Sequence, residues 1–391
     1  MSEINYTTLA EALGEVPDPR NKRGRSFSWQ FILLVIAAAM LTGEKGLKGI
    51  SQWVREQSQE LRTALKPAKN RIPSQSTIRR ALCTVSAEKL EEALKKYQRG
   101  LEKESGGAGT IVTKQGEVLR GQALDGKTVR GASAHGELVH LTSLVSHESG
   151  LVFDQIETKV KMHERRSAET LLGRASLAGT VTTMDALHTS AKQARQIRQG
   201  GGDYLFVVKR NQRTLYEDIE AAFTALPPTG TCEVEFWNYE NVTVKRRGHG
   251  RTDTYLVEST TVLNDYLTFP DVAQVIRRTR RSLNHSTEKM SVSVEYLITS
   301  LGRERVALEQ VEQFRLWHWT IENVVHYPRD ASFGEDRCQV RSGNAPQALA
   351  ALRNAIASLL RIEGWTSLPD GFRYCRSSLQ IVLQLLGASA T

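Results

Sequence analysis

The chain has 391 residues, of which 40% are hydrophobic and 24% charged, which is typical of a globular protein with room for two or three domains. The formal net charge is +9, and residues 1–100 hold 17 Lys and Arg against 10 Asp and Glu, an excess of +7. This basic region favours a polyanionic partner, nucleic acid first and a membrane surface second, with solvated helix faces as the alternative. The four cysteines include no CxxC pair, which argues against a zinc site and a disulfide framework and indicates a reducing cytoplasm.

Residues 1–105 are predicted to be a helical DNA-binding domain. The apolar run within Trp29–Leu41 is too short to span a bilayer and too far from the N-terminus for a signal peptide, so we expect a buried core helix. A second, amphipathic helix is expected over Leu47–Leu65. Gly106–Gly109 is typical of a linker.

A third helix of this region is preceded by an N-cap cluster, Ser74–Thr77. Arg79 and Arg80 lie in its first turns, where a recognition helix would contact DNA. A helix-turn-helix is therefore one interpretation, and a plain basic helical bundle is the other.

After the linker the pattern changes to alternating strands and helices. We expect strands over 118–124, 138–145 and 151–160, a helix over 166–177, a strand over 181–184, a helix over 189–199 and a strand over 204–208. This order predicts an antiparallel meander continued by right-handed parallel crossovers.

Residues 227–302 are predicted to be rich in strands, and residues 303–391 to be helical. The expected strands cover 232–245, 255–259, 272–276 and 291–300, and the expected helices run through Glu322 and then over 344–361 and 376–386. A basic run, Arg277–Arg281, lies among the strands and could contact the DNA backbone, with a solvated strand edge as the alternative.

Three carboxylates stand where chemistry could occur. Asp125 and Asp185 follow apolar strands, at the sheet edge where sites assemble when strands are parallel. Glu322 lies on a helix beside two tryptophans, and a carboxylate is costly to bury there unless it is paired or bound to a metal. If the three converge they need cations, and Mg²⁺ suits such oxygen ligands. Each Asp alone is also compatible with a turn residue.

Several segments resemble those of a bacterial insertion-sequence transposase family of the DDE class, the group that includes the H-repeat-associated proteins. The similar segments are Ala123–Gly131, Thr183–Thr189, Gly202–Gln212, His318–Asn323, Phe333–Arg337, Gly343–Pro346 with the helices after it, and the N-terminal Pro17–Arg20, Arg23–Gly24 and Ile72–Ser74. The resemblance thus extends over nearly the whole chain.

The resemblance implies an α/β fold, with an RNase H-like core over 111–226, a β-rich insertion over 227–302 and a return to the core over 303–391. It implies that Asp125, Asp185 and Glu322 are the catalytic and metal-binding triad, with Mg²⁺, or Mn²⁺ in its place, as the cofactor. The implied reaction is cleavage of phosphodiester bonds at transposon ends, followed by joining of the 3′ hydroxyl to target DNA.

The chain departs from the family pattern just after Glu322. Pro328 should end or kink the helix, and Arg329 falls where related transposases often carry a phosphate-binding Lys. Further cations that could bind DNA are Lys127, Arg130, Arg278 and Arg280, and the expected neighbours of the site are His188, His318 and Asn323.

Two other functions remain compatible with the sequence. A DNA-binding regulatory relative would recognise ends without cutting them, and a nuclease of the same fold would cut without joining. In each case we expect a bacterial protein in the cytoplasm, associated with the nucleoid. A homodimer or larger assembly on DNA is expected, because two ends must be brought together.

Overall fold

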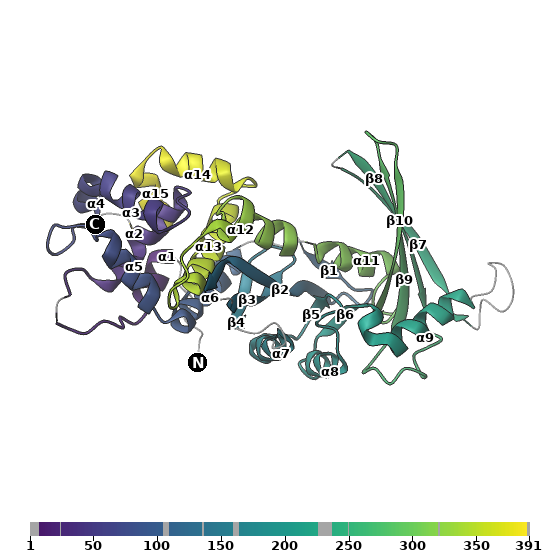
Figure 1. Cartoon of the computed structure of the whole chain (residues 1–391). Helices are drawn as coiled ribbons and strands as arrows, with labels where there is room; N and C mark the ends of the chain where they lie inside the picture. The colour runs from purple at the N-terminus through teal and green to yellow at the C-terminus, as the bar shows by residue number, and fades with distance from the viewer. Residues whose placement is uncertain are drawn as a thin grey trace. The chain divides into compact units, whose positions relative to one another are not determined.

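The computed structural model describes residues 8–23, 25–104, 109–134, 137–158, 164–225, 237–248, 250–319 and 321–388 (Figure 1). The chain divides into two compact units. Unit 1 consists of Met1–Ala108, Gly126–Glu164 and Ile321–Thr391, and unit 2 of Gly109–Asp125 and Arg165–Thr320. Among the described residues, no helix combines the length and apolarity that a membrane crossing requires.

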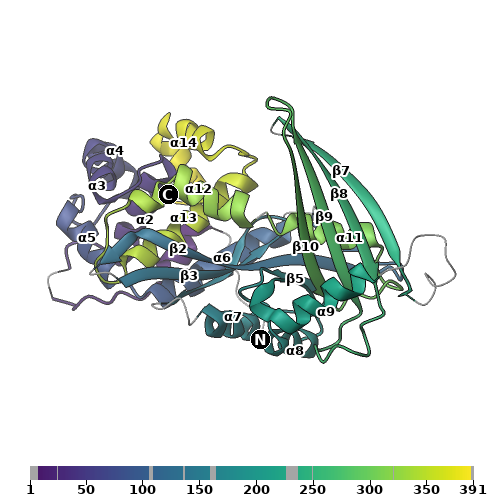
Figure 2. The same cartoon turned by 45° about the vertical axis from the view of Figure 1, so that its right-hand side comes forward.

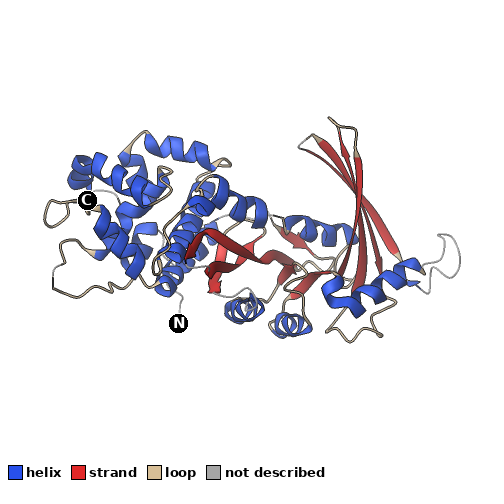
Figure 3. Cartoon of the chain, in the orientation of Figure 1, coloured by secondary structure: helices blue, strands red, loops and turns tan. Residues whose placement is uncertain are grey.

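Unit 1 is mainly helical, as Figure 3 shows in blue. Its helices are α1 (Leu9–Gly14), α2 (Trp29–Leu41), α3 (Leu47–Glu56), α4 (Ser58–Leu65), α5 (Gln75–Thr84), α6 (Ala87–Glu104), α12 (Tyr327–Ala331), α13 (Ala345–Ile362), α14 (Leu368–Arg376) and α15 (Leu379–Leu386), with the short helical turns η3 (Ile321–His326) and η4 (Glu335–Arg337).

The core of unit 1 joins the two ends of the chain. Helix α2 is apolar on all sides and is buried over almost its whole length, and Ser28 caps its first turn by accepting a hydrogen bond from the Phe31 amide. One hydrophobic cluster contains residues of α1–α6 together with residues of α13–α15, among them Leu33, Tyr97 and Leu352. The N-terminal helices therefore share a core with the C-terminal ones.

Unit 1 also holds three neighbouring strands. They are the second half of β2 (Val118–Ala134), β3 (Glu137–Ser146) and β4 (Val152–Thr158), in the order β4-β3-β2. Strands β3 and β4 pair antiparallel, with Thr142 opposite Ile156, and are joined by a short turn. Strand β2 passes from unit 2 into unit 1 between Asp125 and Gly126.

Unit 2 is built on the first half of β2. Its other strands are β1 (Thr110–Val112), β5 (Thr180–Met184), β6 (Asp203–Val208), β7 (Glu240–Gly248), β8 (Arg251–Thr260), β9 (Gln274–Asn284) and β10 (Met290–Thr299). Its helices are α7 (Glu164–Arg174), α8 (Ala191–Gln199), η2 (Arg210–Gln212), α9 (Arg213–Thr224) and α11 (Leu308–Trp317).

The strands of unit 2 follow the order β2-β5-β6-β10-β9-β8-β7, with β1 paired to β2. Strands β2, β5 and β6 are parallel. Strands β6, β10, β9, β8 and β7 each pair antiparallel with the next in this order. Helices α7 and α8 cover one face of β5 and β6, and α11 covers the other (Figure 1). The far ends of β7–β10 extend beyond these helices as a curved ribbon (Figure 2).

The predicted fold class is confirmed: a mixed sheet with helices, together with an N-terminal helical region. Along the chain, the neighbouring strands β2, β3 and β4, of which β3 and β4 pair antiparallel, precede β5 and β6, which run parallel to β2. This is the succession of an RNase H-like core. The predicted β-rich insertion is present as β7–β10, which continue the sheet through the pairing of β10 with β6. The predicted N-cap at Ser74 is confirmed, because its hydroxyl accepts from the Thr77 amide.

Some predicted elements differ from the structure. The expected helix over Leu47–Leu65 is two helices, α3 and α4, which meet at Gln57. Helix α14 was not expected. Of the strand expected over 232–245, residues 232–236 lie outside the described residues, as does most of the expected linker at 106–109.

Candidate metal centre

Asp125 and Asp185 occupy equivalent positions on two neighbouring parallel strands of unit 2. The pairing of β2 with β5 ends with Leu124 opposite Met184, and each aspartate is the next residue. Hydrogen-bonded strands lie about 4.8 Å apart, so the two aspartates lie side by side. Strand β5 ends at Met184, as expected, but β2 continues to Ala134. Asp125 therefore lies within a strand, and the predicted turn after residue 124 is wrong. Both aspartates are half-buried, whereas Leu124 and Met184 are fully buried.

Asp185 is held in its ionised form. Lys209 Nζ, just past the end of β6, donates to both carboxylate oxygens, at 3.1 and 3.4 Å. Burial alone would raise the pKa of Asp185, but a hydrogen bond from the Ala186 amide and the charge of Lys209 outweigh it and hold the pKa below its usual range. Asp185 is therefore an anionic oxygen donor at neutral pH.

Glu322 lies in unit 1 on η3, a π-helical segment that begins at Ile321. The side chain of Glu322 is 53% exposed and that of His326 is 5% exposed. His326, one turn further along, shares a hydrogen bond of 3.1 Å between its Nδ1 and Glu322 Oε2. This hydrogen bond, and the charges of His326 and Lys127, lower the pKa of Glu322 below its usual value.

The backbone around Glu322 is anchored to α13. The guanidinium group of Arg361 donates to the carbonyl of Val324, inside η3. Burial lowers the pKa of Arg361 to about 10, which still leaves it protonated at neutral pH. A π-helical turn leaves backbone groups with poor partners, and a charged donor on the neighbouring helix satisfies one of them.

Lys127 links β2 to the segment that carries Glu322. Its side chain is 9% exposed, and its Nζ forms an ion pair with the Asp330 carboxylate on α12. Because side chains alternate along a strand, Lys127 points to the same face of β2 as Asp125, two residues before it.

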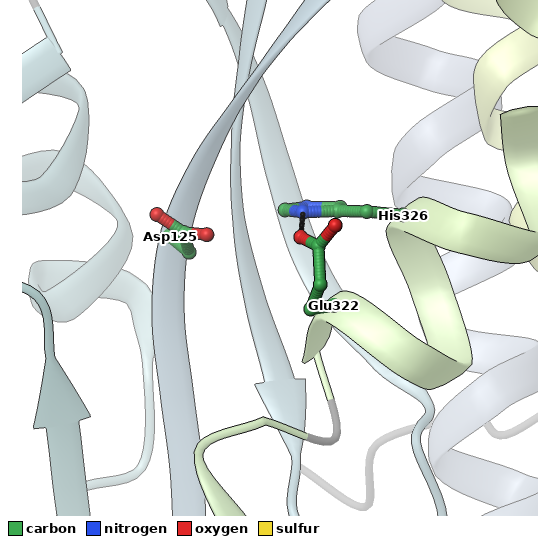
Figure 4. Close-up of side chains that lie close together, drawn as sticks. All are labelled: Asp125, Glu322 and His326. Atoms are coloured by element: carbon green, nitrogen blue, oxygen red, sulfur yellow. Dashed lines mark hydrogen bonds and ion pairs between the residues drawn. The ribbon is translucent and has the colours of Figure 1, made fainter. Parts of the chain in front are cut away.

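Asp125, Glu322 and His326 form a cluster with the composition of a cation site (Figure 4). Each offers one ligand atom, and these atoms lie within 4.8 Å of one another. The two carboxylate oxygens suit Mg²⁺ or Mn²⁺, whereas the imidazole nitrogen is a donor that softer divalent cations prefer. The residues present therefore fit a divalent metal.

Three predicted DNA-contacting arginines have other partners. Arg278 is 6% exposed and forms two hydrogen bonds of 2.8 Å to the Glu312 carboxylate. Arg280 is half-buried and pairs with Asp253 at 3.0 Å. Arg329 is 1% exposed and pairs with Glu335. For Arg278 and Arg329 the prediction is wrong in this structure, because DNA cannot reach a guanidinium group buried against a carboxylate.

The two predicted histidine neighbours are buried. His318 Nδ1 and Thr183 Oγ1, both in unit 2, share a hydrogen bond of 2.8 Å. The ring nitrogens of His188 have no hydrogen-bond partner among the described residues, and burial lowers its pKa to about 4, so it is neutral. Asn323 is exposed on η3.

The remaining cations predicted to bind DNA are Arg79, Arg80 and Arg130. Arg79 and Arg80 are exposed on α5, where Arg80 Nε also donates to the Ser76 carbonyl. Arg130 belongs to β2, and its side chain lies outside the described part of the chain. Their DNA contacts stay predictions.

His326 was not among the predicted site residues. The signal for it was present in the sequence, since four-residue spacing from Glu322 places both on one helical stripe. The spacing alone could not separate a ligand from a packed histidine, and His318, which has the same spacing on the other side, turns out to be tied to Thr183.

Two family models match this chain. The model of the transposase DDE domain matches residues 117–360, and the model of its associated N-terminal region matches residues 10–98. The first match covers more than half of the chain and includes Asp125, Asp185 and Glu322.

Two relatives from Escherichia coli match along most of their length. YncI of strain O157:H7, named a candidate transposase, is 25% identical over 368 residues, 92% of this chain and 88% of that protein. The H repeat-associated YhhI of strain K12, also named a candidate transposase, is 25% identical over 90% of each chain. A cryo-EM structure of the piggyBac transposase synaptic complex with hairpin DNA aligns at a TM-score of 0.45 and 10% identity over 99% of this chain and 78% of that one, too distant to support an argument.

Proposed function

The chain belongs to the transposase DDE domain family, and we propose that it cuts phosphodiester bonds at the ends of a transposable DNA element and joins the freed 3′ hydroxyl to target DNA. The observation that carries the proposal is the placement of the carboxylates. Asp125 and Asp185 each directly follow the last paired residues of β2 and β5, and Asp125 has Glu322 and His326 within metal-binding reach. This is the donor set that metal-assisted phosphoryl transfer needs.

We assign Asp125, Asp185 and Glu322 as the ligands of divalent metal, most simply Mg²⁺ with Mn²⁺ as a substitute. When bound there, the metal would offset charge on the attacking and leaving oxygens of the phosphodiester. His326 would orient Glu322 through its hydrogen bond and is a positioning residue or an additional ligand.

The cations beside these carboxylates have complementary roles. Lys209 keeps Asp185 ionised, and Lys127 favours the ionised form of Glu322 while Asp330 holds it in place. Both lysines also lower the repulsion between the acidic cluster and an incoming phosphate.

The test is a cleavage assay on a labelled duplex that carries the ends of the element, with Mg²⁺ or Mn²⁺. We expect nicking at the ends, and a loss of at least about 100-fold in Asp125→Asn, Asp185→Asn and Glu322→Gln, because outer-shell partners of metals alone are worth about 10–100-fold. The matched control is Glu309→Gln, an exposed glutamate on α11 that should cut normally.

Three results separate this proposal from the alternatives. Full cutting by any of the three carboxylate variants would contradict the triad. Binding of the ends without cutting under any metal would favour a regulatory protein. Cut ends without joined products would favour a nuclease. Sedimentation of the protein–DNA complex counts the copies of the chain in it, and we expect two copies, one for each end.

A further inference from the structure

The four-stranded ribbon β7–β10 of unit 2 has one face whose charged side chains are paired and one whose cations are exposed to solvent. Strand register defines the faces, because residues opposite one another on neighbouring strands project to the same side. Lys245, Thr254, Arg281 and Val292 are aligned across β7, β8, β9 and β10. The row two residues nearer the tip consists of Arg247, Thr252, Leu283 and Met290. We call the face that carries these two rows the open face.

The opposite face is covered and its charges are paired. Arg278 pairs with Glu312 of α11, and Arg280 pairs with Asp253. Arg246 donates to the side chain of Gln313, also on α11. Tyr255 and Val257 pack into the hydrophobic cluster that contains α11.

The cations of the open face are left to solvent. Lys245, Arg247 and Arg281 are exposed, and none of them forms an ion pair within the described part of the chain. The two rows contain no acidic residue. Three exposed cations on a rigid sheet without a compensating carboxylate make a surface for a polyanion.

The open face also exposes apolar side chains beside these cations. Met290, Val292 and Val294 of β10 are 67%, 60% and 53% exposed. They alternate with serines along the strand, so all three point to the open face. Exposed apolar groups next to cations can rest against the deoxyribose edge while the cations contact phosphate.

We propose that the open face of β7–β10 binds the phosphate backbone of duplex DNA through Lys245, Arg247 and Arg281. The assignment rests on the proposed function, which requires DNA as substrate. Lys245 and Arg247 lie two residues apart on one strand, about 6.8 Å, which equals two base-pair steps of about 3.4 Å along the DNA helix axis.

The geometry makes this contact independent of DNA sequence. The major groove is about 12 Å wide and admits a helix or a two-stranded ribbon. Four strands span about 14 Å between their axes before side chains are added, so the ribbon lies across the backbone and does not enter the groove. The face therefore adds affinity and orientation, whereas sequence must be read elsewhere.

The experiment measures binding of the full chain to a fluorescent random-sequence duplex, in EDTA to prevent cutting, over a range of salt concentrations. The variant is K245Q/R247Q/R281Q. Each lost phosphate contact lowers the slope of log K against log salt by about 0.9, so the expected change is about 2.7. The matched control is R166Q/R174Q/R195Q, which removes three exposed cations of α7 and α8 that form no ion pair among the described residues.

Each outcome decides the assignment. A reduced slope in the ribbon variant, with the control near wild type, supports it. An unchanged slope, or an equal loss in both variants, overturns it and leaves the cutting assay as an independent test of the proposed function. If the wild-type chain binds no DNA, both proposals fall. If Val292→Ser with Val294→Ser lowers the sedimenting mass while the ribbon variant binds normally, the face joins two copies of the chain instead.

Discussion

The buried residue Glu335 shows how a charge in the interior can be structural. Its carboxylate is 0% exposed and accepts hydrogen bonds from Arg329 and from Arg353, both of which are also buried. Burial alone would raise the pKa of Glu335, but the two guanidinium groups outweigh it and the pKa lies below the usual value. Arg329 is therefore a clamp that joins α12 to η4 and α13.

Replacing Glu335 by Gln should strongly destabilise the protein, because two buried guanidinium groups lose their carboxylate. Breaking such a cluster costs about 3–5 kcal/mol of the free energy of unfolding. Urea denaturation measures it, and Arg337→Gln, an exposed neighbour on η4, should stay within about 0.5 kcal/mol of wild type. A loss below about 1 kcal/mol in the Glu335 variant would show that the cluster is dispensable.

Glu335 also makes the free energy of unfolding depend on pH. Because the pKa of Glu335 is lower in the folded than in the unfolded protein, its stabilisation is complete above its ordinary pKa of about 4.5 and is lost as pH falls through the folded pKa. The wild-type protein should therefore lose stability more steeply below pH 4.5 than Glu335→Gln does. Parallel acid limbs for the two proteins would contradict this.

At the scale of elements, a buried ion pair links β9 to α11 beside their shared hydrophobic cluster. Arg278 and Glu312 are both nearly inaccessible, and Arg278 also lies over the Tyr255 ring at 4.1 Å. The sequence showed Arg278 inside a basic run and favoured a DNA contact. The register of β8–β10 instead turns Arg278 towards α11 and turns Arg281 to the open face.

Removing one partner of this pair should cost more than removing both. Glu312→Gln removes the carboxylate that accepts both hydrogen bonds of the buried Arg278, which keeps only the Glu295 carboxylate at 3.6 Å. It should lower the free energy of unfolding by about 3 kcal/mol. Arg278→Met combined with Glu312→Leu fills the space with apolar groups and should recover most of that loss. Thermal unfolding compares the variants. A double variant as unstable as Glu312→Gln would mean that the pair itself, and not the orphaned charge, matters.

The helical segment after Glu322 differs from the prediction at Pro328. The prediction was that proline ends or kinks the helix. In the structure the π-helical η3 ends at His326, and Pro328 lies in the first turn of α12, a position that does not need its missing amide. The proline therefore marks a change of helical type.

At the scale of the whole molecule, the shared core of unit 1 determines whether the N-terminal helices can be removed from the rest of the chain. Residues 1–105 were predicted to be a domain, yet α2, α5 and α6 pack against α13 in one hydrophobic cluster. Deleting residues 1–108 would expose buried faces of α13 and α15, including Leu352, Leu360 and Val382.

We expect the chain truncated to residues 109–391 to be insoluble or to unfold without cooperativity, because it exposes a large apolar face. Circular dichroism and dye binding during denaturation measure this, with the full chain as reference. A soluble truncated protein with a single sharp transition would show that residues 1–108 form an independent domain.

The sequence by itself determined the class of most strands and helices, the caps, and the position of Asp185 after a strand, because apolar periodicity and turn residues are local. It did not show that β2 continues past Asp125 to Ala134. The sequence also identified Glu322 as a candidate, because its position on an apolar helix can be recognised without knowing its partners. Tertiary structure decided which cations face solvent and which are buried, and it selected His326 over His318 as the companion of Glu322. Those choices depend on strand register and on packing between residues far apart in the chain, where a shift of one residue reverses the face.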